Sequence, residues 1–288
     1  MIPVDLHCHS TVSDGLLSPR EVVRLAHSRG CQLFALTDHD DLRGLAEAAD
    51  EANQLGMPFV TGVEISVSWG KHILHVVGLG FDPENAALKQ GLEAVRSGRW
   101  ERAERMAESL AKVGIPDALE GARKYAENPE MISRAHFARY IVEIGKAKDV
   151  RSVFYKYLKP GMPGFVEHEW ARLHEAVAWI TDAGGVALLA HPGRYEMGPE
   201  TLRVLLIEFK RLGGTALEVA SGCHGAADVS RFGRLAKEHG YLASCGSDYH
   251  ATNEGAREPG LNGDLPFGCE PVWTRWLPGF PAPHKPVE

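Results

Sequence analysis

The sequence lacks the features of a membrane protein and of a disulfide-stabilised protein. No apolar run approaches the roughly 18 residues that a transmembrane helix needs. The chain has only five cysteines, an odd number without a Cys-x-x-Cys pair, which argues against a disulfide framework and against a zinc ribbon. Residues 1–6 lead directly into a motif and leave no room for a signal peptide. We therefore expect a soluble cytoplasmic protein with reduced thiols and no membrane partner.

An excess of positive charge is also missing. The 31 Lys and Arg residues are outnumbered by 38 Asp and Glu residues, which gives a formal net charge of −7. A protein that binds long nucleic acid usually has a basic surface, because neutralisation of phosphates drives its affinity. The composition therefore predicts no long nucleic acid as a partner and favours a small phosphorylated substrate.

Short apolar runs alternate with helical patterns in the first and last parts of the chain. Ser18 to Glu21 form a capping box with proline at the first helical position, and Gly30 is a suitable stop for that helix. Alternation of strands and helices is typical of a parallel sheet or a barrel. We predict strands at residues 3–6, 32–36, 58–63, 73–78, 186–190, 216–219 and 241–245, and further helices at 42–54, 171–182, 199–211 and 227–239.

The middle of the chain shows helical patterns without a convincing strand between them. These patterns cover residues 99–113, 116–127, 133–144 and 149–158. We interpret them as a helical insertion that acts as a lid or substrate-binding element. The predicted organisation is a first barrel part at 1–98, the insertion at 99–165, and a second barrel part at 166–288 with a proline-rich tail from residue 265.

The segment His7-Cys8-His9 directly follows the first predicted strand. Side chains two positions apart on an extended segment point to the same side, so both imidazoles can reach one metal ion while Cys8 points away. Asp14 follows in a turn-like stretch. Taken alone, such a pair is as consistent with a chance arrangement on the surface as with metal binding.

The same residue types recur at or near the ends of the other predicted strands. In a (β/α) barrel the carboxyl ends of the strands open onto one face, so these side chains are expected to converge there. Packed together without a cation, so many donors would repel one another and stay unpaired. We therefore predict a site for two or three divalent metal ions, formed by His7, His9, Asp14, His39, Glu64, His75, His191, Asp248 and His250.

The surroundings of these residues form six short motifs. They are His7-Cys8-His9-Ser10, Ser13-Asp14-Gly15, Thr37-Asp38-His39-Asp40, Gly62-Val63-Glu64-Ile65-Ser66, Ala190-His191-Pro192-Gly193-Arg194 and Gly246-Ser247-Asp248-Tyr249-His250. In this order they resemble the motifs of the PHP (polymerase and histidinol phosphatase) superfamily over nearly the whole chain. The place of the helical insertion resembles the branch that contains 3′,5′-nucleoside bisphosphate phosphatases and short-RNA 5′ exonucleases.

The resemblance implies an α/β fold, a distorted (β/α)7 barrel similar to a TIM barrel. It also implies a trinuclear centre, with manganese as the first expectation and iron or zinc as alternatives. Some relatives have histidine at the position of Asp14, which leaves the third ion the least defined. The implied ligands are His7, His9, Glu64 and Asp248 for one ion, Glu64 as a bridge with His75 and His191 for a second, and Asp14, His39 and His250 for a third.

Phosphate groups need cationic and preferably forked donors, and two arginines stand beside the motifs. Arg194 lies three residues beyond His191. Arg134 follows Ser133 at the start of a predicted helix and resembles a substrate-binding element of the same branch, in which proline more often stands where this chain has Ala135. His136 is a further candidate for substrate contact, with a structural role in the core as the alternative.

A second pair of arginines lies on the first predicted helix of the insertion. Arg102 and Arg105 are one turn apart and could reach a second phosphate. The alternative is that both are exposed and only solvate the surface. Trp69, Trp100 and Trp170 are interpreted as packing residues rather than as platforms for base stacking.

The residues and the resemblance together predict hydrolysis of a phosphate monoester on a small nucleotide. The expected reaction converts a 3′,5′-nucleoside bisphosphate to the 5′-monophosphate by attack of a metal-bridging hydroxide. His191, Asp248, Arg134 and Arg194 are the expected catalytic residues. Three alternatives stay open: a 5′-3′ exoribonuclease on short RNA, a histidinol-phosphate phosphatase, and a non-catalytic PHP module.

Overall fold

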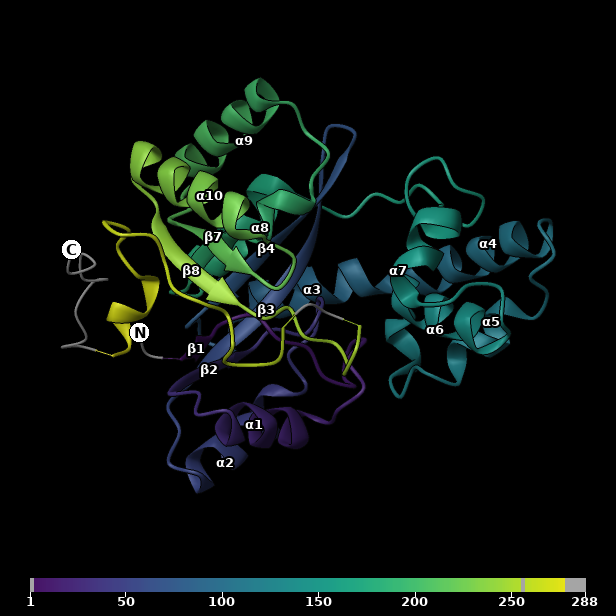
Figure 1. Cartoon of the computed structure of the whole chain (residues 1–288), viewed down its shortest axis with the longest axis horizontal. Coiled ribbons are helices and arrows are strands. Elements are labelled where there is room, and N and C mark those ends of the chain that lie inside the picture. The colour runs from purple at the N-terminus through teal and green to yellow at the C-terminus, as the bar shows by residue number, and fades with distance from the viewer. Residues whose placement is uncertain (1–2, 255–256, 278–288) are drawn as a thin grey trace.

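The protein folds around one sheet that curls into a nearly closed barrel, described by a computed structural model for residues 3–254 and 257–277 (Figure 1). The strands are β1 (Val4–Asp5), β2 (Leu33–Leu36), β3 (Phe59–Trp69), β4 (His72–Leu79), β5 (Ala171–Arg172), β6 (Val186–Leu189), β7 (Ala216–Ser221) and β8 (Leu242–Gly246). Neighbouring strands pair in the order β1-β2-β3-β4-β6-β7-β8, and β5 pairs with β3 beside this path.

Backbone hydrogen bonds between the first and the last strand close the barrel. Leu6 N–H donates to Cys245 O at 3.1 Å, and Asp248 N–H donates to His7 O at 2.8 Å. Most neighbouring strands are parallel, but β4 runs antiparallel to both β3 and β6. The predicted fold class, a distorted (β/α)7 barrel, is confirmed, and the reversed strand is its distortion.

Helices cover the outside of the barrel, where each buries an apolar stripe. They are α1 (Pro19–Ser28), α2 (Leu45–Gln54), α3 (Ala86–Ser97), α8 (Leu173–Asp182), α9 (Pro199–Leu212) and α10 (Ala226–His239). The predicted capping box of α1 is confirmed, since Glu21 N–H donates to Ser18 Oγ and the Glu21 carboxylate accepts from Ser18 N–H. None of the helices in the described ranges combines the length and apolar character that a membrane crossing requires.

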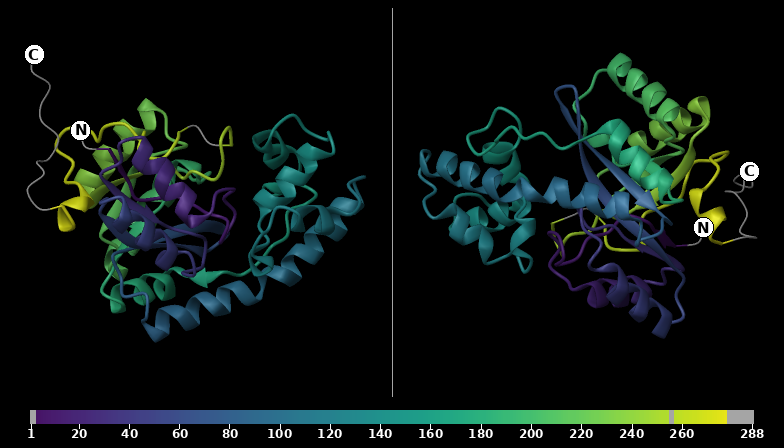
Figure 2. Two further views of the ribbon diagram at one scale, coloured as in Figure 1. Left: turned by 90° about the horizontal axis from the view of Figure 1, so that it is seen from below. Right: turned by 180° about the vertical axis from the view of Figure 1, so that it is seen from behind.

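Beside the barrel stands a group of helices that we call the helical lobe, residues 99–165 (Figure 1). It contains α4 (Arg99–Ala111), α5 (Ala118–Arg123), α6 (Arg134–Glu143), α7 (Val150–Val153) and the short turns η1 (Pro129–Met131) and η2 (Phe154–Leu158). The lobe has a hydrophobic core of its own, which includes Leu110, Phe137 and Ile141. Figure 2 shows α3 and α4 following each other from the barrel into the lobe.

Polar contacts attach the lobe to the rim of the barrel. Arg139 forms a forked ion pair with Glu254, with nitrogen–oxygen distances of 2.8 and 2.7 Å. Ser133, the residue before α6, donates its hydroxyl to Asp14 Oδ2 at 2.8 Å. The second contact joins the lobe directly to a candidate metal ligand.

Two elements differ from the sequence-based expectation. Helix α3 was not predicted, because Gly91 interrupts its pattern; a Cβ there would lie 2.5 Å from the Trp179 ring, so the glycine allows α3 to pack closely on α8. The helix predicted at 171–182 begins later, since Ala171 and Arg172 pair with β3 as strand β5. This pairing is available because β3 is longer than predicted and continues to Trp69.

One further helix departs from its prediction, and the proline-rich tail is described only in its first part. The predicted helix at 149–158 is α7 followed by a π-helical turn, η2. The start of the proline-rich tail lies against the barrel, where Ala243 N–H donates to Glu270 O at 2.7 Å and a turn, η4 (Val272–Arg275), follows. Residues 278–288, which contain the last four prolines of this tail, lie outside the described residues.

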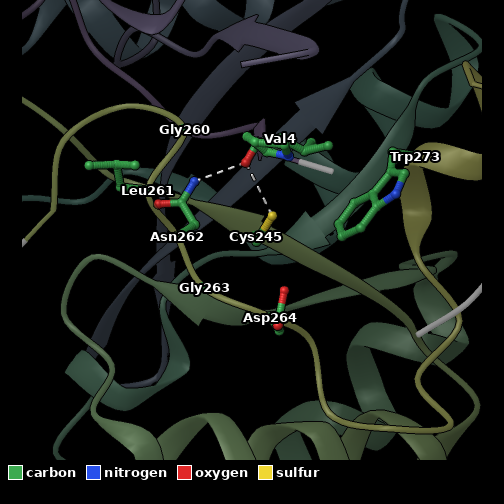
Figure 3. Close-up of a pocket in the computed structure, with 9 residues that line it drawn as sticks. Val4, Cys245, Gly260, Leu261, Asn262, Gly263, Asp264 and Trp273 are labelled. Carbon is green, nitrogen blue, oxygen red and sulfur yellow. Dashed lines mark hydrogen bonds between the residues drawn. The ribbon is translucent and has the colours of Figure 1, made fainter. Parts of the chain in front are cut away.

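A cavity of about 300 Å³ lies at the seam between β1 and β8 (Figure 3). Residues 260–264 line it together with Trp273, and the Asn262 amide donates to Val4 O at 3.0 Å. None of the candidate metal ligands lines this cavity, so it is separate from the site described next.

Candidate metal centre

The Glu64 side chain lies at the centre of the candidate site. It projects from β3 and is completely buried. Burial alone would raise its pKa, but the surrounding histidines, above all His75, His39 and His7, hold the pKa well below its usual range. Five imidazole nitrogens lie within 3.3 Å of its oxygens: His7 Nε2 at 3.2 Å, His9 Nε2 at 3.3 Å, His39 Nδ1 at 2.9 Å, His75 Nδ1 at 2.8 Å and His191 Nε2 at 2.9 Å.

The segment after β1 brings two of these imidazoles to Glu64. His7 and His9 are completely buried, and Cys8 between them forms a backbone bridge with Tyr249. The structure thus places both imidazoles on one side, as their spacing predicted. Asp248 approaches the same pair from the end of β8, with Oδ1 3.3 Å from His9 Nε2 and 3.6 Å from His7 Nε2.

The expectation that every candidate group stands at or near the carboxyl end of a strand is wrong for Glu64 and His75. Glu64 lies within β3, and His75 lies near the start of β4, opposite Ser66 of β3. Because β4 is antiparallel, its amino-terminal half reaches the rim to which the other strands point their carboxyl ends. The hairpin of β3 and β4 therefore supplies the central carboxylate and an imidazole from its own length.

Asp14, His39 and His250 form a second part of the cluster. Asp14 Oδ1 lies 3.2 Å from His250 Nε2 and 3.8 Å from His39 Nε2. Burial would raise the pKa of Asp14, but His250 and His39 hold it well below its usual range. The His9 ring stacks on the His250 ring with centroids 4.2 Å apart, so this group adjoins the one around Glu64.

The donor atoms divide into overlapping groups, each of a size that could hold an ion. In each group one atom per residue lies within 4.8 Å of the others. His191 stands beside the third group, 3.3 Å from His75. The groups are His7, His9, Glu64 and Asp248; His9, Asp14, His39 and His250; and His39, Glu64 and His75.

These residues fit divalent metal ions on chemical grounds. Imidazole nitrogens and carboxylate oxygens are the ligands that zinc, manganese and iron accept. Buried polar atoms cost free energy unless they are paired. Within the described residues, the buried atoms that lack a partner in hydrogen-bond geometry include His7 Nε2, His9 Nε2, Asp14 Oδ1, Glu64 Oε2 and Asp248 Oδ1.

The site is open on one side. His39, His75 and His250 are partly exposed, whereas the other candidate ligands are buried. His191 and Asp248 have positive φ angles of 24° and 51°, a conformation that costs on the order of 1–3 kcal/mol. The backbone is thus strained at His191 and at Asp248, two residues whose side chains belong to the cluster.

Three buried carboxylates that support the cluster were not singled out from the sequence. Asp38 accepts the hydroxyls of Ser10 and Ser13, both at 2.6 Å, and so fixes the loop that carries Asp14. Asp5 accepts the N–H groups of His7 and Ser247, which lie on the two sides of the seam, and Glu218 contacts two candidate ligands. The sequence feature that could have identified such residues is an acidic residue inside an apolar strand, as in Ala216-Leu217-Glu218-Val219.

Two of the predicted substrate-binding arginines stand beside the metal ligands. Arg194, in the turn η3 (Pro192–Arg194), is exposed and pairs with Asp248. Arg134 is the first residue of α6, and burial together with the nearby Arg194 lowers its pKa to about 10. His136 is buried; its Nδ1 accepts Ser133 N–H at 3.0 Å, and burial lowers its pKa to about 4, so it is neutral.

Arg102 and Arg105 occupy different environments. Arg105 is exposed, but Arg102 is only 3% exposed, so the alternative of two exposed arginines is wrong for Arg102. Its guanidinium lies over the Trp170 ring, 5.3 Å from the centroid, and Arg99 lies over the same ring at 4.7 Å. Burial and the charges of the neighbouring arginines, Arg134 first, hold the pKa of Arg102 well below its usual range.

The barrel, its reversed strand and the imidazole–carboxylate cluster at one rim define a metal-binding hydrolase fold. The family model of the PHP domain matches residues 5–158 of the sequence. The chain therefore belongs to the PHP domain family.

Characterised relatives cover almost the whole chain. The sequence is 52% identical over 273 residues to the 3′,5′-nucleoside bisphosphate phosphatase of Chromobacterium violaceum, over 95% of this chain and 96% of that protein. It is 40% identical over 272 residues to a 5′-3′ exoribonuclease of Haemophilus influenzae, over 94% of this chain and 98% of that protein. The prediction of a phosphoesterase of this superfamily is confirmed by these relatives.

Two solved structures share the fold. An amidohydrolase from Chromobacterium violaceum with bound sulfate and no metal superimposes with a TM-score of 0.93 at 51% identity, over 96% of both chains. A protein from Bifidobacterium adolescentis described as a putative metal-dependent phosphoesterase superimposes with a TM-score of 0.81 at 26% identity, over 95% of this chain and 94% of that chain.

Substitution of Glu64 by Gln tests the central position of this carboxylate. The variant is expected to bind Mn²⁺ more than about 100-fold more weakly, because even residues that only orient a ligand contribute roughly 10–100-fold. Equilibrium dialysis with metal analysis measures this. Glu51→Gln, a buried carboxylate paired with Arg24 on the outside of the barrel, is the matched control and should bind like the wild type. Equal Mn²⁺ uptake by the two variants would contradict the assignment.

Proposed function

We propose that this protein is a metal-dependent phosphatase that removes the 3′-phosphate of a 3′,5′-nucleoside bisphosphate and releases the 5′-monophosphate. The observation that carries the proposal is the gathering of the candidate ligands around Glu64, with arginines on two sides. The 52% identity to a phosphatase named for this substrate supports the choice of substrate.

The candidate ligands would hold two or three divalent ions, with manganese as the first expectation and iron or zinc as alternatives. Bound ions supply Lewis acidity and positive charge at the reacting phosphate. One group includes His7 and Asp248, another includes Glu64 and His75 with His191 beside it, and the remaining group includes Asp14. Glu64, His9 and His39 each belong to two of the compact groups, and of these three only the Glu64 carboxylate has two oxygens that neighbouring ions could share.

Arg134 and Arg194 would hold the phosphate that is cleaved. Arg134 belongs to the lobe and Arg194 to the barrel, and their mutual repulsion contributes to the lowered pKa of Arg134. An anion between two guanidinium groups relieves such repulsion, and forked N–H donors match phosphate oxygens. Arg194 now pairs with Asp248; a cation on Asp248 would compete for this carboxylate and leave the guanidinium for phosphate.

Arg102 would bind the second phosphate of the substrate. Its Nε is buried and has no hydrogen-bond partner among the described residues, which is costly for a charged group. A 5′-phosphate would supply the missing acceptor. Arg105, being exposed, would contribute only a weaker and screened attraction.

The helical lobe would act as a lid over the reacting phosphate. Ser133 bonds to Asp14, and the next residue is Arg134, so the lobe and the metal cluster are joined where the substrate would lie. The buried His136 Nε2, which carries the proton because Nδ1 is an acceptor, has no partner among the described residues. It would donate a neutral hydrogen bond to a substrate oxygen.

A 5′-3′ exoribonuclease acting on short RNA is the second candidate. It is favoured by the 40% identity to a protein of that name over nearly the whole chain and by the open side of the site at His39, His75 and His250. We expect either activity in the cytoplasm, where thiols such as the five free cysteines stay reduced.

A comparison of substrates tests the proposed function. With Mn²⁺, phosphate release from a 3′,5′-nucleoside bisphosphate should be faster than release of mononucleotides from a 5′-phosphorylated RNA trimer or of phosphate from histidinol phosphate. The product, identified by mass spectrometry and chromatography, should be the 5′-monophosphate. A preference for the trimer would support the exoribonuclease instead, and turnover of none of the three would support a non-catalytic module.

Substitution of Arg102 by Ala tests the second phosphate site. The KM for the bisphosphate should rise by about 10–100-fold, because a hydrogen bond to a charged group contributes about 1.5–3 kcal/mol. Hydrolysis of the matching nucleoside 3′-monophosphate, which has no 5′-phosphate, should change little. Arg105→Ala is the control, with a change of less than about threefold. An equal fall in kcat/KM on both substrates in the Arg102→Ala variant would contradict this role.

A further inference from the structure

Glu218 is a buried carboxylate inside the barrel that contacts two candidate metal ligands at once. It lies on β7 and is completely buried. The pairing of β7 with β8 shifts by one residue between Glu218 and Ala220, which marks a β-bulge directly after the glutamate. Bulges next to functional sites redirect side chains, and this one stands where Glu218 turns toward the cluster.

The first contact is with the His7 ring. Glu218 Oε1 lies 3.1 Å from His7 Nδ1, while Nε2 of the same ring faces Glu64 at 3.2 Å. A proton on Nδ1 that is donated to Glu218 leaves the Nε2 lone pair free for an ion. The carboxylate thereby fixes both the orientation and the tautomer that His7 needs.

The second contact is with the backbone of His191. Its N–H donates to Glu218 Oε2 at 2.6 Å, at a residue whose φ angle of 24° is strained. The bond holds this residue in the conformation in which its ring reaches Glu64, 2.9 Å away. His224 supports the same region, because it lies 2.9 Å from the carbonyl of the bulge residue Val219 and accepts Gly193 N–H.

The neighbouring strand leaves room for this arrangement at Gly246. A Cβ at this position would lie 2.2 Å from His7 Cβ and 2.9 Å from Glu218 Oε1. A side chain on β8 would therefore separate Glu218 from His7. Glycine at this point of β8 is required for the contact.

We propose that Glu218 is a positioning residue that couples two parts of the metal centre, because one carboxylate holds the His7 ring and the His191 backbone through its two oxygens. The proposal rests on the proposed function only in that His7 and His191 bind ions. Both acceptor atoms of the carboxylate are in use, so a glutamine, which has one acceptor, cannot satisfy both groups.

Zn²⁺ binding to Glu218→Gln and Glu218→Ala tests this role without substrate. The affinity, measured by competition with a chromophoric chelator, should fall by about 10–100-fold in both variants. In ¹⁵N-histidine-labelled, Zn²⁺-loaded protein, the Nδ1 proton of His7 should give a signal protected from exchange that is lost in Glu218→Gln. Glu51→Gln, with the same chemical change at a buried position outside the barrel, should retain both properties.

The outcomes separate this role from general stabilisation and from failure of the metal centre. A drop in the melting temperature of the metal-free variants with Zn²⁺ affinity within about twofold of wild type would overturn the positioning role. An affinity loss in Glu51→Gln equal to that in Glu218→Gln would overturn it as well. If the wild-type protein binds neither Zn²⁺ nor Mn²⁺, both the positioning role of Glu218 and the proposed function are wrong. If the wild-type protein binds ions but turns over no nucleotide, only the proposed function is wrong, and the variants alone decide the role of Glu218.

Discussion

The crowding of imidazoles around the buried carboxylate of Glu64 is the constraint on which the rest of the site depends. Five ring nitrogens within 3.3 Å of two oxygens cannot all form good hydrogen bonds to them, and several nearby polar atoms have no hydrogen-bond partner in the part of the chain that the structure describes. Such an arrangement is costly in a protein interior unless cations share the electron pairs. The barrel can be understood as the scaffold that holds this unfavourable group of atoms together.

The scaffold does so with buried supports placed one step away from the cluster. Asp38 fixes the Asp14 loop, Asp5 joins the first and last strands, and Glu218 holds two ligands. The metal-ligand atoms thus have few alternative positions. This lowers the conformational free energy needed to arrange them when an ion or a phosphate binds. The lobe adds the positive charge of Arg102, whose buried Nε has no hydrogen-bond partner among the described residues.

Much of this arrangement could be predicted from the sequence, for reasons that are local. His7 and His9 follow a strand with a spacing of two, and period-two alternation alone places both rings on one side. The alternation of apolar strands and helices predicted a parallel sheet or a barrel, and the resemblance of the motifs to the PHP superfamily implied the barrel. The helix α3 was missed because Gly91 interrupts its helical pattern. The reason for a glycine there is tertiary, since it leaves room for the Trp179 ring of α8.

Other features depend on tertiary pairing that no local pattern contains. The direction of β4, and hence the route by which His75 reaches the rim, is set by its two antiparallel neighbours. The burial of Arg102 depends on Trp170, almost seventy residues further along the chain. The contacts of Glu218 depend on a bulge and on the absence of a side chain at Gly246. A pattern of residue types showed that a cluster should form, but not which carboxylates support it.

Anomalous diffraction from crystals grown with Mn²⁺ tests the central claim most directly. We expect two or three anomalous peaks at the rim, with at least one at about 2.0–2.2 Å from a Glu64 oxygen, the distance typical of metal–carboxylate bonds. Diffraction from Mn²⁺-soaked crystals with no peak within bonding distance of Glu64, His7 or His191 would contradict it.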